Sequence, residues 1–317
     1  MASTEIVHRA SRLPGSGWME NLLVSLGIRG RTLVIAIPFV WLLLFFFVPF
    51  LIVLWVSTSF VVIAQPPYTH ACPDGGTFCL NISESYGRLF EDTLYIKAYL
   101  NSLMVAAVST VVCLLIAYPM AYGMARCGQS TRNILLMLVI LPFWTSFLIR
   151  VYAWIGLLKN NGLINEILLA LNIIDSPINM MNTNFAVYLG IVYSYLPFMI
   201  LPLYATLEKM DLSLLEAATD LGCKPLKAFF LITVPLSFPG IVAGSMLVFI
   251  PAVGEYVIPE LLGGPGSLMI GKVLVNEFFS NRDWPTASAV AVAILLALVI
   301  PLVIYQRYQD KEMEKES

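Results

Sequence analysis

The chain has 317 residues, of which 59% are hydrophobic and only 12% are charged. Soluble globular proteins carry about 25% charged residues, so this composition excludes a soluble globular domain and indicates an integral membrane protein. The formal net charge of −2 offers no basis for binding nucleic acid, and the five Cys and two His show none of the spacings typical of a metal site.

Residues 1–32 are predicted to form a cytoplasmic N-terminal tail. They lack the order of a signal peptide, in which a basic end, an apolar core and a small-residue cleavage site follow one another. The pattern over residues 15–31 favours an interfacial helix whose apolar side chains face lipid, namely Trp18, Leu22, Leu23 and Leu26. The first membrane span is expected to serve as an uncleaved targeting signal, and residues 307–317 are expected to form a cytoplasmic C-terminal tail.

Six apolar stretches are long enough to cross a bilayer, which requires about 20 predominantly apolar residues in a helix. They extend over residues 33–60, 98–124, 133–157, 185–207, 238–262 and 286–306. The sequence therefore predicts an all-α membrane domain over residues 33–306, with six transmembrane helices and a polar loop at residues 208–237. Internal repeats, which many ion-coupled secondary transporters carry, are not visible in the sequence.

Prolines occur within all six predicted spans. Each proline removes one backbone hydrogen bond, and a broken helix is tolerated in a membrane only where it is buried in protein or lines a cavity. A single-pass anchor has no need of such breaks, so the pattern indicates a protein that provides a pathway across the membrane. The prolines concerned are Pro38, Pro49, Pro119, Pro142, Pro197, Pro202, Pro251 and Pro301.

The distribution of Lys and Arg predicts that both termini lie in the cytoplasm, because cytoplasmic loops carry an excess of basic residues. In this orientation 12 of the 18 Lys and Arg residues lie inside, and one, Arg150, lies within a span. The five that lie outside are Arg88, Lys97, Lys159, Lys272 and Arg282. The same orientation places the loop at residues 208–237 in the cytoplasm.

The first external loop, residues 65–97, contains Cys72 and Cys79. An oxidising periplasm would allow these two residues to form a disulfide that closes a small loop. Two free thiols are the alternative, and the sequence does not distinguish between the two states.

Arg150 lies about 17 residues into the third predicted span, which corresponds to ~25 Å along a helix. At that depth a long basic side chain can extend to the external surface, beside Tyr152 and Trp154. The alternative is an ion pair with Glu255 on another span. Aromatic residues within the spans serve either as packing residues or as contacts for a substrate, and the candidates for contact are Trp144, Tyr193 and Tyr195.

The polar loop at residues 208–237 carries the signals of two short helices. Ser213 and Glu216 have the spacing of a capping box, which predicts a helix start at Ser213. Gly222 suits the left-handed residue that ends such a helix, and Pro225 suits the first position of the next one. The second helix is predicted to end at Pro235. Such a helix pair is suited to be held by a partner, whereas an amphipathic connector lying on the membrane is the alternative.

Two acidic residues, Glu255 and Glu260, lie near the external end of the fifth span, where Pro251, Gly254 and Pro259 predict an interrupted helix. Carboxylates beside unwound backbone would attract a cation at the mouth of a pathway, and Tyr256 would add an aromatic face. The alternative is that both acids lie in water at the external interface.

Residues 266–272 match the first seven positions of a phosphate-binding P-loop, but the next residue is Val273, where the motif requires Ser or Thr to hold magnesium. No strand is predicted before this segment, and the predicted orientation places it outside the cell. We therefore expect no nucleotide site on this chain. The chain also shows no constellation of catalytic residues and is predicted not to be an enzyme.

The loop resembles the coupling loop of ABC importer permeases, on the basis of Glu216, Ala217, Ala218, Gly222, Ile232 and Pro235. This sequence has Val234 where that family usually has Leu. In that family the loop docks on a separate ATP-hydrolysing subunit. The resemblance therefore implies a bacterial inner-membrane permease with the type I ABC importer fold, in which a partner ATPase dimer binds ATP and magnesium.

Beyond the loop, residues 141–154, 159–162, 251–255 and 281–285 resemble polyamine permeases of the PotB/PotH type, and the putrescine permeases most closely. This resemblance covers nearly the whole chain. It implies a second permease subunit, a periplasmic polyamine-binding protein, and putrescine rather than spermidine as the cargo. An ABC importer for another solute and an ion-coupled secondary transporter are the alternatives.

Overall fold

A computed structural model describes residues 30–72 and 76–316. The expected tail at residues 1–32 and the interfacial helix within it lie outside this description, apart from the last residues, with which the first helix begins. The chain divides into two compact units, Met1–Val56 and Ser57–Ser317. Helices dominate both units, and each of the six predicted apolar stretches lies in one or two of the helices described below.

The described part of the first unit, residues 30–56, is apolar and helical. It consists of α2 (Gly30–Leu42), a π-helical turn (Leu43–Phe47) and α3 (Val48–Val56). The π-helical turn ends at Phe47, two residues before Pro49, and its extra residue per turn makes room for a proline ring that would clash with the preceding turn. Residues Val34–Val56 are long and apolar enough to cross a membrane.

A β-hairpin and a short helix begin the second unit. Strands β1 (Phe60–Val61) and β2 (Tyr68–Thr69) pair antiparallel, and α4 spans Ile82–Glu91. Cys72 and Cys79 form a disulfide, with their Cα atoms 5.1 Å apart, so the structure adopts the first of the two states that the sequence left open. We call this part of the unit the α4 end.

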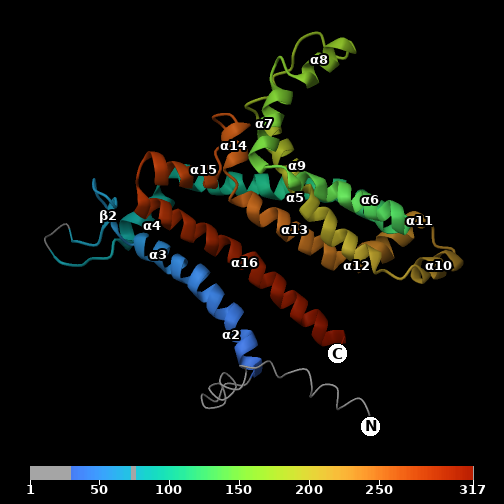
Figure 1. The fold of residues 1–317 in the computed structure, drawn as a ribbon, viewed down its shortest axis with the longest axis horizontal. Helices are drawn as coiled ribbons and strands as arrows, with labels where there is room; N and C mark the ends of the chain where they lie inside the picture. Colours follow the sequence, from blue (N-terminus) through green and yellow to red (C-terminus); the bar gives the residue numbers. More distant parts are fainter. Residues whose placement is uncertain (1–29, 73–75, 317) are drawn as a thin grey trace, which may run out of the picture. The chain divides into compact units, whose positions relative to one another are not determined.

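Three long helices form the core of the second unit: α5 (Thr93–Arg126), α9 (Asn184–Glu208) and α13 (Phe238–Val253). In Figure 1, α5 runs from α4 at one end to α10 and α11 at the other. The buried face of α5 repeats at helical spacing and uses small side chains, which allow close packing. Its fully buried members include Ala106, Ser109, Cys113, Ala117 and Ala121.

Gly240 and Gly244, one turn apart on α13, allow close approach to α9. A Cβ atom at Gly240 would lie 2.6 Å from the Thr206 Oγ1 atom and 3.0 Å from the Pro202 carbonyl oxygen. A Cβ atom at Gly244 would lie 2.8 Å from the Met199 Sδ atom. Small residues spaced by four positions are a common means of bringing two membrane helices together.

Gly240→Ala is expected to destabilise the protein by about 1–3 kcal/mol, because the added methyl group overpacks a contact with backbone and a branched side chain. The measurement is the thermal unfolding midpoint in detergent. Gly123→Ala, on the exposed side of α5 where a Cβ atom meets nothing within 4 Å, is the matched control and should not lower the midpoint. Equal midpoints for the two variants would contradict the assigned contact.

The third predicted span is not one continuous helix. It is divided between α6 (Gln129–Ile140), a 3-10 turn (Leu141–Trp144) and α7 (Phe147–Leu158), which is followed by α8 (Leu163–Ala170). The two halves are bent by 91° (Figure 1). Pro142 lacks a backbone N–H, and the Thr145 hydroxyl donates to its carbonyl at 2.8 Å, so the helix ends there and restarts at Phe147.

The fifth span is interrupted after Val253, as the sequence predicts. Gly254 ends α13, and α14 (Val257–Leu261) and α15 (Ile270–Val275) follow, with a π-helical turn (Asn276–Ser280) before α16 (Trp284–Glu316). Most of the predicted proline breaks are wrong, because five of the eight prolines lie inside helices that continue past them. These are Pro38, Pro119, Pro197, Pro202 and Pro251.

Candidate functional site

The polar loop forms two short helices joined at a sharp turn. Helix α10 (Ser213–Asp220) ends at Gly222, whose φ of +77° is the left-handed conformation that the sequence predicts. The Cys223 N–H donates to the Ala218 carbonyl and the Gly222 N–H to the Thr219 carbonyl, both at 2.9 Å. This Schellman arrangement satisfies the last carbonyls of α10 and directs the chain into α11 (Pro225–Ala228).

The predicted capping box is wrong, although α10 begins at the predicted residue. Leu212 already has helical backbone angles, so Ser213 lies inside the helix and its side chain makes no cap. Asp211 acts instead, because its Oδ1 atom accepts the Ser213 N–H at 2.9 Å. Hydrogen bonds from Ser213, first from its backbone amide, lower the pKa of Asp211. Asp211, two residues before the helix start, is visible in the sequence and could have been identified there as the residue that accepts this hydrogen bond.

The predicted end of the second helix at Pro235 is correct to within one residue. After α11, a π-helical turn (Phe229–Thr233) and α12 (Val234–Leu236) carry the helix to Leu236. The wider π-helical turn precedes Pro235 and accommodates its ring, as the equivalent turn does before Pro49. The helix then bends by 64° into α13 at Ser237.

The surface of the two helices is uncovered in the second unit. Leu221 is 88% exposed and Leu226 is 74% exposed, although both are large apolar residues. Glu216 is exposed and has no hydrogen bond or ion pair through its carboxylate in the described part of the chain. An apolar area with an unpaired acid at its edge is typical of a surface that binds a partner. We call Glu216, Leu221 and Leu226 the α10 surface.

The Glu255 carboxylate lies inside the bundle and accepts three hydrogen bonds. Glu255 is only 7% exposed, so the alternative that it lies in water is wrong. Its Oε2 atom accepts the Tyr195 hydroxyl at 2.5 Å, and its Oε1 atom accepts the N–H groups of Val257 at 3.0 Å and Ile258 at 3.3 Å. These bonds fix the start of α14 against α9.

All the hydrogen-bond partners of Glu255 are neutral donors. Within residues 30–72 and 76–316, no Lys, Arg or His forms an ion pair with this carboxylate. Burial of an acid without a cationic partner is costly, so such acids are commonly functional. The arrangement leaves one carboxylate between α9 and α14 that only neutral groups contact among the described residues.

The other proposed pathway residues are not gathered around Glu255. Glu260 forms an exposed ion pair with Lys272 at 2.9 Å, which agrees with its position in water. Tyr256 is 42% exposed and Trp144 is 76% exposed, and neither has a contact with Glu255 through its side chain. Tyr195 alone, of the aromatic residues considered, contacts this carboxylate.

Arg150 neither pairs with Glu255 nor extends freely to solvent. Its guanidinium lies over the rings of Phe147, at 5.8 Å, and Phe143, at 6.0 Å. The Nε and Nη1 atoms are buried and have no hydrogen-bond partner among the described residues. Phe143 packs on Phe198 at 5.0 Å, so an aromatic cluster separates Arg150 from the Tyr195–Glu255 pair.

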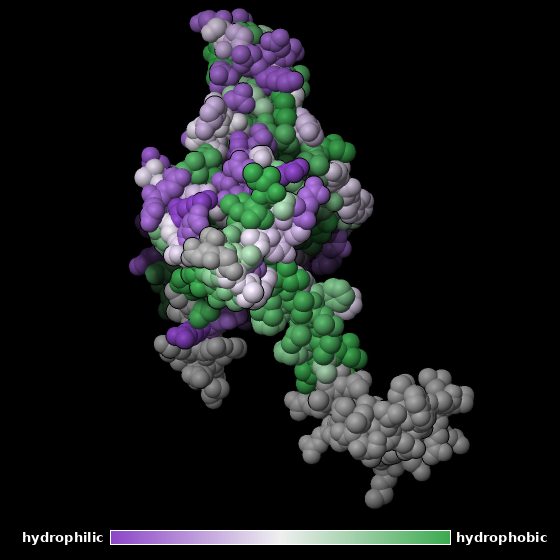
Figure 2. Space-filling model, turned by 90° about the vertical axis from the view of Figure 1, so that its left-hand side faces the viewer, coloured by the Kyte–Doolittle hydropathy of each residue, from purple (hydrophilic) through white to green (hydrophobic). Residues whose placement is uncertain are grey.

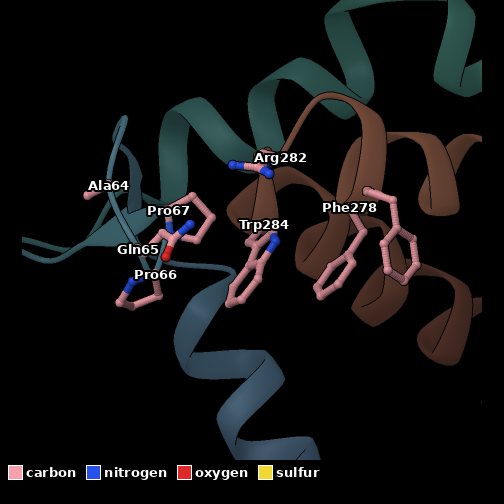
Figure 3. Close-up of a pocket in the computed structure, with 8 residues that line it drawn as sticks. Ala64, Gln65, Pro66, Pro67, Phe278, Arg282 and Trp284 are labelled. Carbon is pink, nitrogen blue, oxygen red and sulfur yellow. The ribbon is translucent and has the colours of Figure 1, made fainter.

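An open pocket of about 480 Å³ lies at the α4 end, beside the stacked rings of Phe278 and Trp284 (Figure 3). Arg282 has no ion pair in the described part of the chain. The faces of the two aromatic rings could attract a cationic ligand. The Arg282 guanidinium repels cations, however, so this pocket does not suit a cationic ligand. The pocket is lined by Ala64, Gln65, Pro66, Pro67, Phe278, Phe279, Arg282 and Trp284.

The α4 end is predominantly polar. Figure 2 looks onto this end, where hydrophilic side chains surround smaller apolar areas. The flanks of the long helices differ, because Leu100 and Leu115 on α5 are 62% and 69% exposed. A polar end and apolar flanks are what a helical bundle in a bilayer requires.

Comparison with known proteins gives consistent matches over most of the chain. Residues 114–315 match the family described as "Binding-protein-dependent transport system inner membrane component". The chain is 41% identical over 279 residues to the "Spermidine/putrescine transport system permease protein PotB" of Haemophilus influenzae, which covers 87% of this chain and 93% of that protein. The protein of the same name from Escherichia coli is 40% identical, with coverage of 87% and 98%.

Among solved structures, a bacterial alginate ABC transporter superposes on this chain with a TM-score of 0.64. The match covers 86% of this chain and 90% of that chain, at 14% sequence identity. At this identity the likeness supports a shared fold and nothing about the cargo.

Proposed function

The chain belongs to the family of binding-protein-dependent transport system inner membrane components, and from this membership we propose that it forms part of the pathway of a polyamine importer. Its relatives are permease subunits of ABC importers, so the chain is a multi-pass inner membrane permease and not an enzyme. The sequence resemblance to ABC importer permeases is thereby confirmed. Our proposal concerns three further points: the cargo, the orientation in the membrane and the partner subunits.

The proposed cargo is a polyamine, and putrescine in preference to spermidine. The observation that carries this proposal is the buried Glu255 carboxylate, which no cation neutralises among the described residues. A polyamine supplies ammonium groups that can pair with a single carboxylate, and Tyr195, which contacts this carboxylate, adds one aromatic ring beside it. The names of the PotB relatives, which refer to spermidine and putrescine, agree with this chemistry.

The proposed orientation places both termini and the α10 surface in the cytoplasm. There the α10 surface docks on one subunit of an ATPase dimer, which binds the ATP and magnesium. A second permease subunit completes the pathway in the membrane, and a periplasmic polyamine-binding protein delivers the cargo at the α4 end. Membrane lipid covers the apolar flanks. The exposed apolar residues Leu221 and Leu226, beside the unpaired Glu216, support the docking step.

The proposed mechanism is alternating access. ATP binding closes the ATPase dimer and moves the two α10–α11 helix pairs of the permeases together, which opens the pathway to the periplasm. Hydrolysis reverses the movement. A change in the ratio of two states from 1:99 to 99:1 requires ~5.5 kcal/mol of differential binding, which docking on an ATPase can supply and lipid contact alone cannot.

The test is uptake of labelled putrescine and spermidine in cells with and without this chain. We expect uptake of both compounds to require the chain, with putrescine transported at lower concentration. Unlabelled putrescine should compete with the label, whereas an uncharged diol of the same length should not. Uptake that is unchanged without the chain, or that persists when the ATPase partner is deleted, would contradict the proposal.

A further inference from the structure

The loop joins the core at two places, through residues 209–212 to α9 and through a sharp bend to α13. The helical segment 225–236 ends at Leu236, and the chain turns by 64° into α13 at Ser237. Along the chain, a movement of α11 reaches α13 through this bend. A bend whose angle is free to change absorbs a displacement, whereas a bend whose angle is fixed transmits it. The contacts that hold the angle at Ser237 therefore matter.

Phe229, on the loop side of the bend, is held by two residues of α5. Its ring meets Tyr118 edge-on at 5.5 Å and Tyr122 edge-on at 5.6 Å. Edge-to-face pairs of this kind contribute beyond the apolar area that they bury, and they fix orientation as well as distance. The loop helix is therefore attached to α5 before the chain enters α13.

Tyr118 also holds the bend itself. Its hydroxyl lies 2.8 Å from the Ser237 Oγ atom, and the Ser237 hydroxyl donates to the Val234 carbonyl at 3.0 Å. Since the Ser237 hydroxyl has one proton, Tyr118 is the donor to Ser237. Ser237 is only 1% exposed, so this hydrogen bond does not compete with solvent.

The far side of the bend is held by a different helix. Gly240, three residues beyond Ser237, packs against the Pro202 carbonyl and Thr206 of α9. Next to Tyr118, Pro119 removes a backbone hydrogen bond of α5. The bend therefore has an attachment to α5 on one side and to α9 on the other. Among the described residues, the Tyr118 hydroxyl makes the side-chain hydrogen bond that links α5 to Ser237 itself.

We propose that Tyr118 is a positioning residue that sets the angle at Ser237, so that a displacement of the α10–α11 helices is passed to α13 instead of being absorbed at the bend. This inference rests on the proposed function, because it assumes that a partner moves these helices. In this proposal Tyr118 determines how efficiently ATP hydrolysis is coupled to transport. It has no role in assembly of the complex or in recognition of the cargo.

The test uses the complete transporter reconstituted in proteoliposomes, with the ratio of labelled putrescine taken up to ATP hydrolysed as the main readout. Tyr118→Phe keeps the contact with Phe229 and removes only the hydrogen bond to Ser237. We expect this ratio to fall about fivefold, which is the effect of one buried hydrogen bond. Ser237→Ala should lower the ratio equally, and the double variant should add nothing further.

Tyr122→Phe is the matched control, because Tyr122 makes the same ring contact with Phe229 while its hydroxyl has no hydrogen bond among the described residues. It should keep the wild-type ratio. All variants should bind the ATPase and remain folded at the assay temperature, which separates a coupling defect from a folding defect.

The outcomes separate this inference from the function on which it rests. A wild-type complex that hydrolyses ATP without taking up putrescine would overturn the proposed cargo. A wild-type complex that transports, with Tyr118→Phe indistinguishable from Tyr122→Phe, would overturn the role of Tyr118 alone. Additive losses in the Tyr118→Phe, Ser237→Ala double variant would also overturn it, since the two groups would then act independently.

Discussion

Glu216→Lys is expected to abolish association of the ATPase while the chain remains inserted and folded. The carboxylate is exposed and has no partner in the described structure, so nothing in the fold depends on it. Lys at this position would repel any group of the partner that attracts the Glu216 carboxylate. We therefore expect association at least about 100-fold weaker, which corresponds to ~3 kcal/mol. The measurement is co-purification of the ATPase with the permease from membranes.

The chain offers a closely matched control for this variant. Glu166 is exposed and is the fourth residue of α8 (Leu163–Ala170), just as Glu216 is the fourth residue of α10 (Ser213–Asp220). Both are first-turn acids of eight-residue helices, so Lys at either position has the same unfavourable effect on the helix dipole. Glu166→Lys should leave co-purification intact. Equal behaviour of the two variants would remove the docking role from the α10 surface.

Glu255→Gln is expected to lower the efficiency of polyamine uptake at least about 30-fold, or ~2 kcal/mol, because it removes a buried charge without changing side-chain volume. The measurement is initial uptake rate against putrescine concentration. The apparent affinity should carry most of the loss, because the variant retains the shape of the pathway and lacks the charge that attracts the cation.

Glu255 also holds α14 against α9, so a second variant must separate charge from structure. Tyr195→Phe removes the hydrogen bond to Oε2 and leaves the carboxylate in place. It should reduce uptake far less than Glu255→Gln. If the two variants lose uptake equally, Glu255 is a structural residue, and the proposed cargo loses the observation that carries it.

Local features of the chain could be predicted because they depend on a few adjacent residues. Gly222 adopts the expected left-handed conformation, since no other residue type adopts it at so little cost. The interruption after Val253 was also predicted, although Gly254 has an ordinary φ of −88°. The end of the second helix was predicted to within one residue. The capping box was wrong, because the Asp211 side chain lies close enough to accept the Ser213 N–H instead.

Contacts between distant residues were beyond the reach of sequence patterns. Tyr118 and Ser237 are 119 positions apart, and Tyr195 and Glu255 are 60 positions apart. The spacing of Gly240 and Gly244 suggests a close helix contact, but it does not identify α9 as the partner. The pairing of Arg150 with Glu255 was an available alternative, and the aromatic cluster around Phe143 shows why it does not occur here.

By itself the sequence determined that this is a helical membrane protein with a polar two-helix loop. Hydrophobic length, basic residues in loops and turn residues act locally, so they can be identified without coordinates. Only the tertiary structure decided which acid is buried and which helix holds the loop. Those outcomes depend on how α5, α9 and α13 pack, and packing selects one set of distant contacts from many that the same sequence pattern allows.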